Sequence, residues 1–220
     1  MRLVAVRKFF GLGGMVVLGT GGMGREAAAW VTEAGQGPLL GFLDDDPTRR
    51  GAMAAGQRVL GGLDWLDDHP DIEVVLGVGS PQVRVAVLRS LDEHGIRPAT
   101  VIHPTAHIGP RVLVGPGSII CPGAVLTCDI SLGRAVIVNY GASVGHDGRV
   151  GDAAFIAPGA HVAGNVSIGE RADIGIGASI IQGITIGPEA VVGAGAVVIR
   201  DVEPGATVVG VPARPLEPRN

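Results

Sequence analysis

Aromatic residues are scarce in this chain, which has one tyrosine, two tryptophans and four phenylalanines among 220 residues. Charged residues are also few, at 17%, whereas apolar residues make up 46% and the mean hydropathy is +0.40. Disordered chains are poor in apolar residues, so this composition excludes a disordered chain despite 37 glycines and 15 prolines. The core must be built from valine, isoleucine, leucine and alanine, and so many glycines predict a regular, turn-dense architecture.

Lysine is nearly absent, since the 17 basic residues are all arginines except Lys8 and are scattered along the chain. The net charge is −4, and no basic stripe with interleaved aromatic residues occurs, which argues against nucleic-acid binding. The number and spacing of the two cysteines, Cys121 and Cys128, exclude a disulfide framework and a zinc motif. The first 15 residues lack a sustained apolar segment and a small-residue cleavage site. We therefore expect a cytoplasmic protein with no metal and no membrane association.

The dominant pattern is an aliphatic residue at every sixth position from residue 102 to residue 198. The spacing continues without a break through Ile102, Ile108, Val114, Ile120, Leu126, Leu132, Val138, Val144, Val150, Ile156, Val162, Ile168, Ile174, Ile180, Ile186, Val192 and Val198. Glycine often comes next, and a small residue often stands two positions before. A period of six matches neither an α-helix nor a hairpin meander, but it fits a short strand followed by a tight corner.

This period predicts a solenoid in which three six-residue segments close one triangular coil, so that residue i stacks on residue i+18. The aliphatic residue of each segment points inward and lies over its equivalent in the next coil, about 4.8 Å along the axis. The repeats make between five and six coils, whose backbone groups pair from coil to coil. Glycine and asparagine are expected at the corners, where positive φ or a very small side chain is needed. The pattern therefore assigns residues 101–200 to a parallel β-helix, followed by a C-terminal tail at 201–220.

A different pattern precedes the repeats, from residue 15 to residue 100. Five elements are predicted there: strands at 15–18, 39–43 and 73–78, and helices at 25–34 and from Pro81 to the glycine at 95. The apolar face of the second helix is predicted to consist of Val83, Ala86, Val87 and Leu91. Alternating strands and helices predict a small α/β domain with a parallel sheet. Residues 1–14 are predicted to be a short extension before it.

A glycine-rich motif, Gly19-x-Gly21-x-x-Gly24, lies between the first predicted strand and helix. This is the context of a dinucleotide-binding loop, in which the backbone approaches a pyrophosphate and the helix N-terminus supplies N–H groups. Asp44, at the end of the next strand, is placed to accept a hydrogen bond from a ribose hydroxyl. Roughly 85 residues form one mononucleotide-binding half, whereas a dehydrogenase uses two. The motif therefore predicts a nucleotide-sugar ligand; the alternative is that the glycines only form a tight turn.

Candidate catalytic residues are concentrated in the segment Ser143-Val144-Gly145-His146-Asp147. Acyl transfer from a thioester to an amine or hydroxyl needs a base, and histidine, with an ordinary pKa of about 6.5, suits this role. His146 comes two positions after Val144, at or beside a corner, where a side chain can leave the core. The stacking of successive coils places Gly164 over His146, where its amide can hydrogen-bond a thioester carbonyl. Asp147 can contact the imidazole only at a corner, because neighbours in an extended chain point to opposite sides.

The other histidines are less suited to catalysis. His69 and His94 are predicted to be solvated. His103 and His107 flank a proline at the start of the first coil, and His161 is predicted to point outward. A carbonic anhydrase built on the same repeat needs three imidazoles that converge on zinc. His107, His146 and His161 lack the close pair expected for such a site. The alternative to a catalytic His146 is therefore a structural corner histidine.

Seven segments match the motifs of one known family. They are Gly19-Thr20-Gly21-Gly22-Met23-Gly24, Gly41-Phe42-Leu43-Asp44-Asp45-Asp46, Gly77-Val78-Gly79-Ser80, Val101-Ile102-His103-Pro104, Ser143-Val144-Gly145-His146-Asp147, Ala163-Gly164-Asn165 and Gly210-Val211-Pro212-Ala213-Arg214. With these motifs the chain resembles, over nearly its whole length, the sialic acid O-acetyltransferase and nucleotide-sugar N-acetyltransferase family of the NeuD and PglD type. The resemblance implies a hexapeptide-repeat acyltransferase, in which a left-handed β-helix follows a small Rossmann-like nucleotide-sugar-binding domain.

The resemblance also implies binding partners and site residues. It implies a homotrimer with acetyl-CoA lying along the solenoid between neighbouring subunits. It implies His146 as general base, Asp147 as its acidic partner and Asn139 near the acceptor. It implies that acetyl-CoA is contacted by Gly164 at the acetyl carbonyl and by Ile176 and Ala194 at the pantetheine. It implies that the nucleotide sugar is held by Gly19, Gly21, Gly22, Gly24, Asp44, Asp45 and Gly79.

The expected reaction is direct acetyl transfer from acetyl-CoA to the amine of a nucleotide-linked amino sugar, of the UDP-4-amino-sugar type. Neither cysteine lies in a motif for a covalent acyl intermediate. O-acetylation of sialic acid or another sugar is an alternative, and a non-catalytic trimeric scaffold or ligand sensor is an alternative of another class. Phe155 departs from the family pattern, since some relatives carry histidine there. Without that imidazole the acyl site is more apolar, and a larger acyl group becomes possible.

Overall fold

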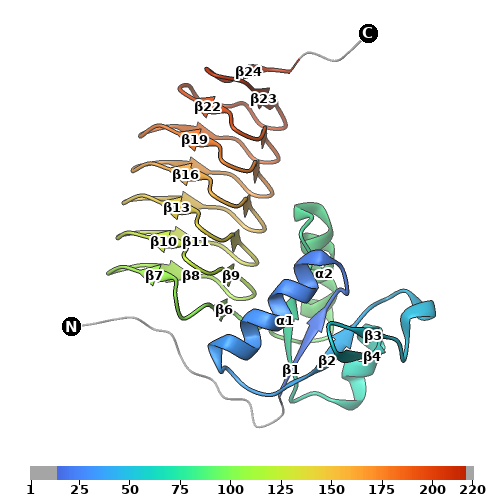
Figure 1. Cartoon of the computed structure of the whole chain (residues 1–220). Coiled ribbons are helices and arrows are strands. Elements are labelled where there is room, and N and C mark those ends of the chain that lie inside the picture. The colour runs from blue at the N-terminus through green and yellow to red at the C-terminus, as the bar shows by residue number, and fades with distance from the viewer. Residues whose placement is uncertain (1–13, 217–220) are drawn as a thin grey trace.

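The computed structural model describes residues 14–216. Within them the chain forms a five-stranded α/β layer and a long β-helix that stands beside it (Figure 1). Apart from Gly14, the predicted extension at 1–14 lies outside the described residues, as do the last four residues of the predicted tail. None of the helices in the described part of the chain has the length and apolar character needed to cross a membrane.

The α/β layer contains four parallel strands, one antiparallel strand at an edge and two long helices. The strands are β1 (Met15–Leu18), β2 (Leu39–Leu43), β3 (Met53–Ala54), β4 (Gln57–Gly61) and β5 (Glu73–Leu76), in the sheet order β3-β4-β2-β1-β5. The α-helices are α1 (Gly22–Ala34) and α2 (Pro81–Glu93), and two short 3₁₀ helices are η1 (Pro47–Arg49) and η2 (Leu63–Asp68). Only β3 is antiparallel to its neighbour, so the sheet is mixed rather than wholly parallel as predicted.

The predicted apolar face of α2 is right for Leu91 and Val87, which pack in a core cluster, and wrong for Val83 and Ala86, which are exposed. Val83 is 48% exposed, whereas Arg84 and Leu91 are fully buried and Leu88 is nearly so. Leu88 and Leu91 pack against the sheet, and the side of α2 that carries Arg84 is turned toward the coils, where backbone carbonyls bind the guanidinium. Apolar spacing alone could not detect this orientation, because a charged residue occupies one of the fully buried positions.

The β-helix consists of short strands that recur every six residues. They are β6 (Val101–Ile102), β7 (His107–Ile108), β8 (Leu113–Val114), β9 (Ile119–Ile120), β10 (Val125–Leu126), β11 (Ser131–Leu132), β12 (Ile137–Val138), β13 (Ser143–Val144), β14 (Arg149–Val150), β15 (Phe155–Ile156), β16 (His161–Val162), β17 (Ser167–Ile168), β18 (Asp173–Ile174), β19 (Ser179–Ile180), β20 (Thr185–Ile186), β21 (Val191–Val192), β22 (Val197–Val198), β23 (Thr207–Val209) and β24 (Arg214–Pro215). Each strand up to β22 pairs in parallel with the strand three repeats away; Val144, for example, pairs with Leu126 and Val162. The predicted closure of each coil by three repeats is confirmed.

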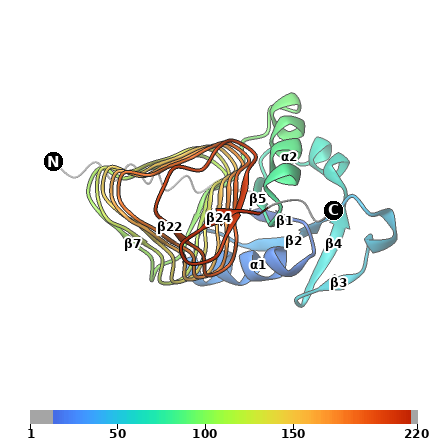
Figure 2. The same ribbon diagram turned by 90° about the horizontal axis from the view of Figure 1, so that it is seen from above.

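Three sheets form the sides of the β-helix. Sheet I runs from β6 through β9, β12, β15, β18 and β21 to β23 and β24, sheet II from β7 to β22, and sheet III from β8 to β20. Viewed along the axis the coils superimpose as a three-sided outline, with the α/β layer against one side (Figure 2). The antiparallel strand β24 pairs with β23 at the C-terminal end of sheet I. Pairing of this kind covers strand edges that would otherwise be free to associate.

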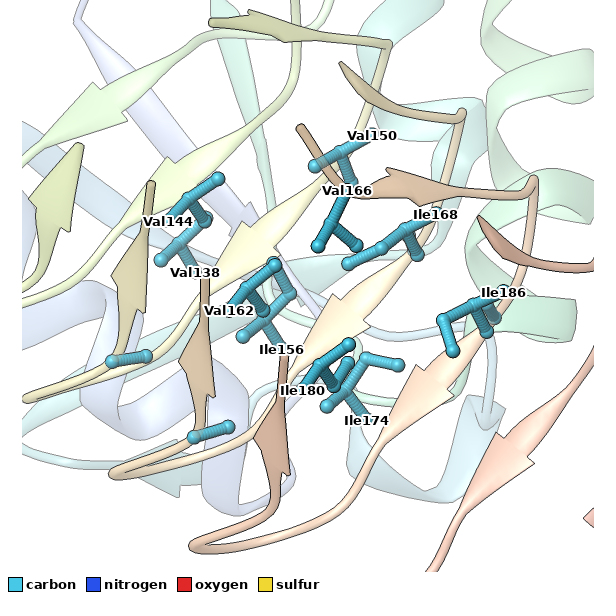
Figure 3. Packing of buried hydrophobic residues seen from close by; sticks show 14 of the residues in the cluster. Val138, Val144, Val150, Ile156, Val162, Val166, Ile168, Ile174, Ile180 and Ile186 are labelled. Atoms are coloured by element: carbon cyan, nitrogen blue, oxygen red, sulfur yellow. The ribbon is translucent and has the colours of Figure 1, made fainter. Parts of the chain in front are cut away.

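The core of the β-helix is a stack of aliphatic side chains (Figure 3). Val144 and Ile156 are fully buried, and Val162 is 3% exposed. The corners, however, are not limited to glycine and asparagine. Arg111, Asp129 and several other non-glycine residues have φ near +55°, a conformation that costs L-residues roughly 1–2 kcal/mol. Hydrogen bonds from one coil to the next, such as Asp129 N–H to the Pro110 carbonyl, hold these corners in place.

Sheet I carries the contact with the α/β layer. Val101, Ile119 and Ile137 belong to one buried apolar cluster with Trp30 and Val31 of α1. Polar contacts reinforce this junction: His103 Nε2 lies 2.7 Å from Glu33 Oε2 of α1, and Gln36 donates to the Thr100 carbonyl. The α/β layer therefore rests on one defined side of the β-helix, which fixes which sides remain open.

Candidate active site

The corner after β13 brings His146 and Asp147 into direct contact. Asp147 has φ +60°, which turns the chain so that two adjacent side chains converge. His146 Nδ1 lies 2.8 Å from Asp147 Oδ2. Both side chains remain more than half exposed, at 58% and 56%. The sequence reasoning required a corner for this contact, and the corner is present.

The hydrogen bond to Asp147 decides which nitrogen of His146 can act as a base. An ionised carboxylate only accepts hydrogen bonds, so Nδ1 carries the proton and Nε2 keeps a free lone pair. Nε2 faces the next coil at Gly164, where an added Cβ would lie only 2.4 Å from it. Only glycine leaves room for the imidazole at this position. The arrangement can accept a proton at Nε2.

The amide of Gly164 is a second functional group beside the imidazole. Within residues 14–216, the Gly164 nitrogen donates to no backbone carbonyl, although its own carbonyl accepts from Gly183 N–H. A free N–H beside a base is suited to bind an oxygen on which negative charge develops. His146 Nε2 and the Gly164 N–H therefore provide a proton acceptor and a hydrogen-bond donor on successive coils.

A groove of about 380 Å³ borders Asp147 on the preceding coils. Asp147 and Arg149 line one part of it, and Arg111 and Asp129 line another. Arg111 Nη2 donates to Asp129 Oδ2 at 2.7 Å. The side-chain hydrogen bond from Arg111 is the main cause that lowers the pKa of Asp129 below its ordinary value. The groove therefore places two arginines and two carboxylates next to the candidate base.

The glycine loop between β1 and α1 has two kinds of glycine. A Cβ on Gly24 would lie 1.9 Å from the Gly19 carbonyl oxygen, so Gly24 allows the helix to pack against the strand. Cβ atoms on Gly21 and Gly22 would meet no atom within 4 Å. The N-cap residue of α1, Gly21, has no side-chain cap. The N-terminal turn of α1 is therefore open on the side where a phosphate would approach.

Asp44 is bound to the glycine loop. Its Oδ2 accepts from the hydroxyl of Thr20 at 2.5 Å and from the Thr20 amide at 3.2 Å. Arg49 donates to the same hydroxyl at 2.7 Å, and Arg25 donates to the Thr20 carbonyl. Asp45 accepts from the Leu63 amide at 3.3 Å. The sequence reasoning missed Thr20, Arg25 and Arg49, whose convergence depends on the fold.

The predicted site residues divide among three places in a single chain. His146 and Gly164 occupy the corner between sheets II and III, whereas Asn139 and two predicted CoA contacts occupy the corner between sheets I and II. These two contacts, Ile176 and Ala194, are exposed. Asn139 is only 4% exposed, and its Oδ1 accepts from the Tyr140 amide. The glycine loop and Asp44 lie in the α/β layer, on the side of sheet I. Within residues 14–216, no group of three or more histidine, cysteine or acidic side chains is arranged to hold a metal ion.

The fold and these motifs occur together in solved structures. Residues 15–91 match the family model described as the PglD N-terminal domain. The perosamine N-acetyltransferase from Caulobacter crescentus, solved with CoA and GDP-perosamine, is 33% identical, with 94% of this chain and 98% of that chain covered and a TM-score of 0.89. The chain belongs to the PglD-like family of hexapeptide-repeat acetyltransferases. The expected family and its left-handed β-helix are thereby confirmed.

Two further PglD-like proteins cover nearly the whole chain. The acetyltransferase domain of PglB from Neisseria gonorrhoeae, solved with acetyl coenzyme A, is 33% identical, with 92% and 98% coverage and a TM-score of 0.85. WeeI from Acinetobacter baumannii is 34% identical, with 92% and 99% coverage and a TM-score of 0.84. No curated protein sequence matches the chain significantly.

Proposed function

We propose that this chain is an acetyl-CoA-dependent N-acetyltransferase that acts on the amine of a nucleotide-linked amino sugar. The observation that carries the proposal is the column formed by Asp147, His146 and Gly164, with a hydrogen bond of 2.8 Å at one end and a glycine under Nε2 at the other. PglD-like relatives that match the chain over 98% of their length were solved with CoA and GDP-perosamine or with acetyl coenzyme A.

The proposed reaction is a direct transfer. The sugar amine attacks the thioester carbonyl, and Nε2 of His146 takes a proton from the attacking nitrogen. Asp147 stabilises the imidazolium that forms, as a carboxylate does when bonded to the opposite ring nitrogen. The Gly164 amide binds the developing oxyanion. When the carbon–sulfur bond breaks, the leaving CoA thiolate takes the proton from the imidazolium, and the amide and free CoA are produced.

The glycine loop is the proposed site of the nucleotide sugar. Gly21 and Gly22 leave space beside the N-terminus of α1 for the diphosphate, and Asp44 and Asp45 stand at the end of β2 for the ribose. We retain a UDP-linked sugar as the expected substrate. The Caulobacter relative binds a GDP-linked sugar, so a test must include both nucleotides.

A homotrimer is the assembly that we propose for catalysis. The α/β layer packs against the first coils on the side of sheet I, whereas His146 occupies the corner between the other two sheets. A sugar held by the glycine loop is therefore remote from the base of its own chain, and a neighbouring copy must supply that base. The predicted CoA contacts also lie at two different corners, which fits a cofactor held between two β-helices. We assign the reaction to the cytoplasm.

The test is a thiol-release assay with acetyl-CoA and a panel of UDP-, GDP- and dTDP-linked amino sugars together with free sialic acid. We expect release with a nucleotide-linked amino sugar. The His146→Ala variant should lose about 10²–10⁴-fold in turnover and keep its affinity for acetyl-CoA, whereas the exposed His161→Ala serves as the matched control. Release with sialic acid alone would contradict the proposed acceptor. Unchanged turnover in the His146 variant would remove this residue from the mechanism.

A further inference from the structure

Arg84 of α2 is a fully buried cation that lies between the α/β layer and the β-helix. Each of its five N–H donors has a backbone carbonyl as partner: Nε donates to Ala135 at 3.0 Å, Nη1 to Val78 at 3.0 Å and Gly79 at 2.5 Å, and Nη2 to Ala153 at 2.7 Å and Ala154 at 3.2 Å. An arginine side chain has no further donors. Its hydrogen-bonding capacity is therefore used completely within the chain.

The five carbonyls come from three separate segments. Val78 and Gly79 belong to the loop after β5, in the α/β layer. Ala135 stands before β12, and Ala153 before β15, so they occupy the same corner on successive coils. Ala135 and Ala153 both have positive φ, at 51° and 53°. One guanidinium thus connects the loop after β5 to two coils whose corner backbone is held in a disfavoured conformation.

No carboxylate among the described residues bonds to Arg84. Burial is the main cause that lowers the pKa of its guanidinium to about 10, so the group stays charged at neutral pH. The carboxylate that attracts it is Asp173, whose own pKa is raised by burial. The guanidinium also lies over the ring of Phe155, 5.7 Å from its centroid. A buried charge is a poor source of stability compared with an apolar side chain of similar size. The advantage of arginine here is the fixed planar arrangement of its five N–H donors, which matches carbonyls from separate segments.

The loop that Arg84 holds is in contact with the glycine loop. A Cβ on Gly77 would lie 2.6 Å from the Gly24 Cα, and a Cβ on Gly19 would lie 3.0 Å from the Gly77 carbonyl oxygen. Gly77 N–H also donates to the Leu18 carbonyl, at the end of β1. Movement of the segment 77–79 would therefore displace the backbone at which the nucleotide sugar is proposed to bind.

We propose that Arg84 is a positioning residue for the acceptor: it fixes the loop after β5 against the β-helix and thereby sets where the nucleotide sugar lies relative to the acetyl-transfer surface. This inference rests on the proposed function. Arg84 touches neither substrate in this proposal, because all of its donors are occupied by the chain itself. Its effect on the reaction passes through Val78 and Gly79.

Kinetics of two Arg84 variants test the proposal. Arg84→Lys keeps the charge but has three donors at a single nitrogen, and Arg84→Gln removes the buried charge so that no unpaired cation remains. For both, we expect the KM for the nucleotide sugar to rise at least tenfold while the KM for acetyl-CoA stays within twofold of wild type. Arg89→Gln, an exposed arginine on the same helix, is the control and should change neither value. An equal rise in both KM values, or no change in either, would overturn the proposal.

Amide hydrogen exchange gives a second readout that does not depend on turnover. In the Arg84→Gln protein, exchange of the Gly77 amide, which donates to the Leu18 carbonyl, should become at least tenfold faster, with the amides of the coils after β16 unchanged. Faster exchange throughout the chain would indicate a purely structural role and reject the inference. The proposed function is judged separately, on the wild-type protein: absence of thiol release with every nucleotide sugar would reject that function but leave the exchange result decisive for Arg84.

Discussion

The β-helix and the α/β layer achieve burial in different ways. In the β-helix one inward position repeats every six residues, and side chains such as Val144 and Ile156 belong to one continuous cluster. In the α/β layer each buried residue has its own surroundings: Trp30 packs toward the coils, and Leu66 belongs to a separate cluster on the other side of the sheet. Because the repeat is so regular, it shows from the sequence alone which positions face outward, and His146 is at such a position. The α/β layer has no such repeat from which the position of a functional residue could be predicted.

The largest expected effect is the loss of turnover in Gly164→Ala, which tests whether the corner of the β-helix carries the catalytic group. The added Cβ would lie 2.4 Å from His146 Nε2, so the imidazole must move, and turnover should fall about 10²–10⁴-fold. The thiol-release assay measures this loss. Gln182→Ala, in the same column one coil further on, is the control and should retain activity. Normal turnover in Gly164→Ala would show that the imidazole is not needed in this position.

The core stack provides the next largest effect. Ile156→Ala removes a fully buried side chain from a central coil and should reduce the free energy of unfolding by about 2–5 kcal/mol. Ile108→Ala, in the first coil, should cost less, because Ile108 is partly buried and its strand has a partner on one side only. Urea denaturation of both variants measures the difference. Equal losses would contradict the view that each coil is stabilised by its neighbours.

Thiol reactivity distinguishes the junction of the two regions from a corner of the β-helix. Cys121 is completely buried in the cluster shared with α1, and burial raises the pKa of its thiol. Cys128 is partly exposed, and its pKa is raised mainly by desolvation, with a further contribution from Asp129. A thiol reagent at pH 8 should therefore modify one cysteine in the folded protein and two after denaturation. Rapid modification of two thiols in the folded protein would mean that the junction opens.

The smallest effect is expected at the contact between α1 and the first coil. Glu33→Gln replaces the carboxylate that lies 2.7 Å from the nearly buried His103 and should lower the free energy of unfolding by about 1 kcal/mol. Glu26→Gln, an exposed residue on the same helix, is the matched control. The midpoint of urea denaturation measures both. If the two variants were indistinguishable, this contact would contribute nothing to the joining of the two regions.

The sequence was sufficient to predict the features that depend on local spacing. The three-sided coil followed from the aliphatic repeat, and the stacking of Gly164 on His146 followed from the coil. Positive φ at Asp129 could not be predicted, because coil-to-coil hydrogen bonds impose it on a residue with no local preference as strong as that of glycine. The burial of Arg84 could not be predicted either, since its five acceptors come from segments up to 70 residues away. Long-range contacts of this kind leave no periodic signal.

The attachment of the α/β layer by Arg84 has a consequence for how this architecture can vary. Among residues 14–216, direct hydrogen bonds from the layer to the coils reach no further than Ala154, and the later coils stand clear of the layer (Figure 1). Beyond that point the coils are not hydrogen-bonded to the α/β layer of their own chain. An insertion or a deletion of one complete coil there would change the length of the β-helix and leave its contacts with the α/β layer unchanged.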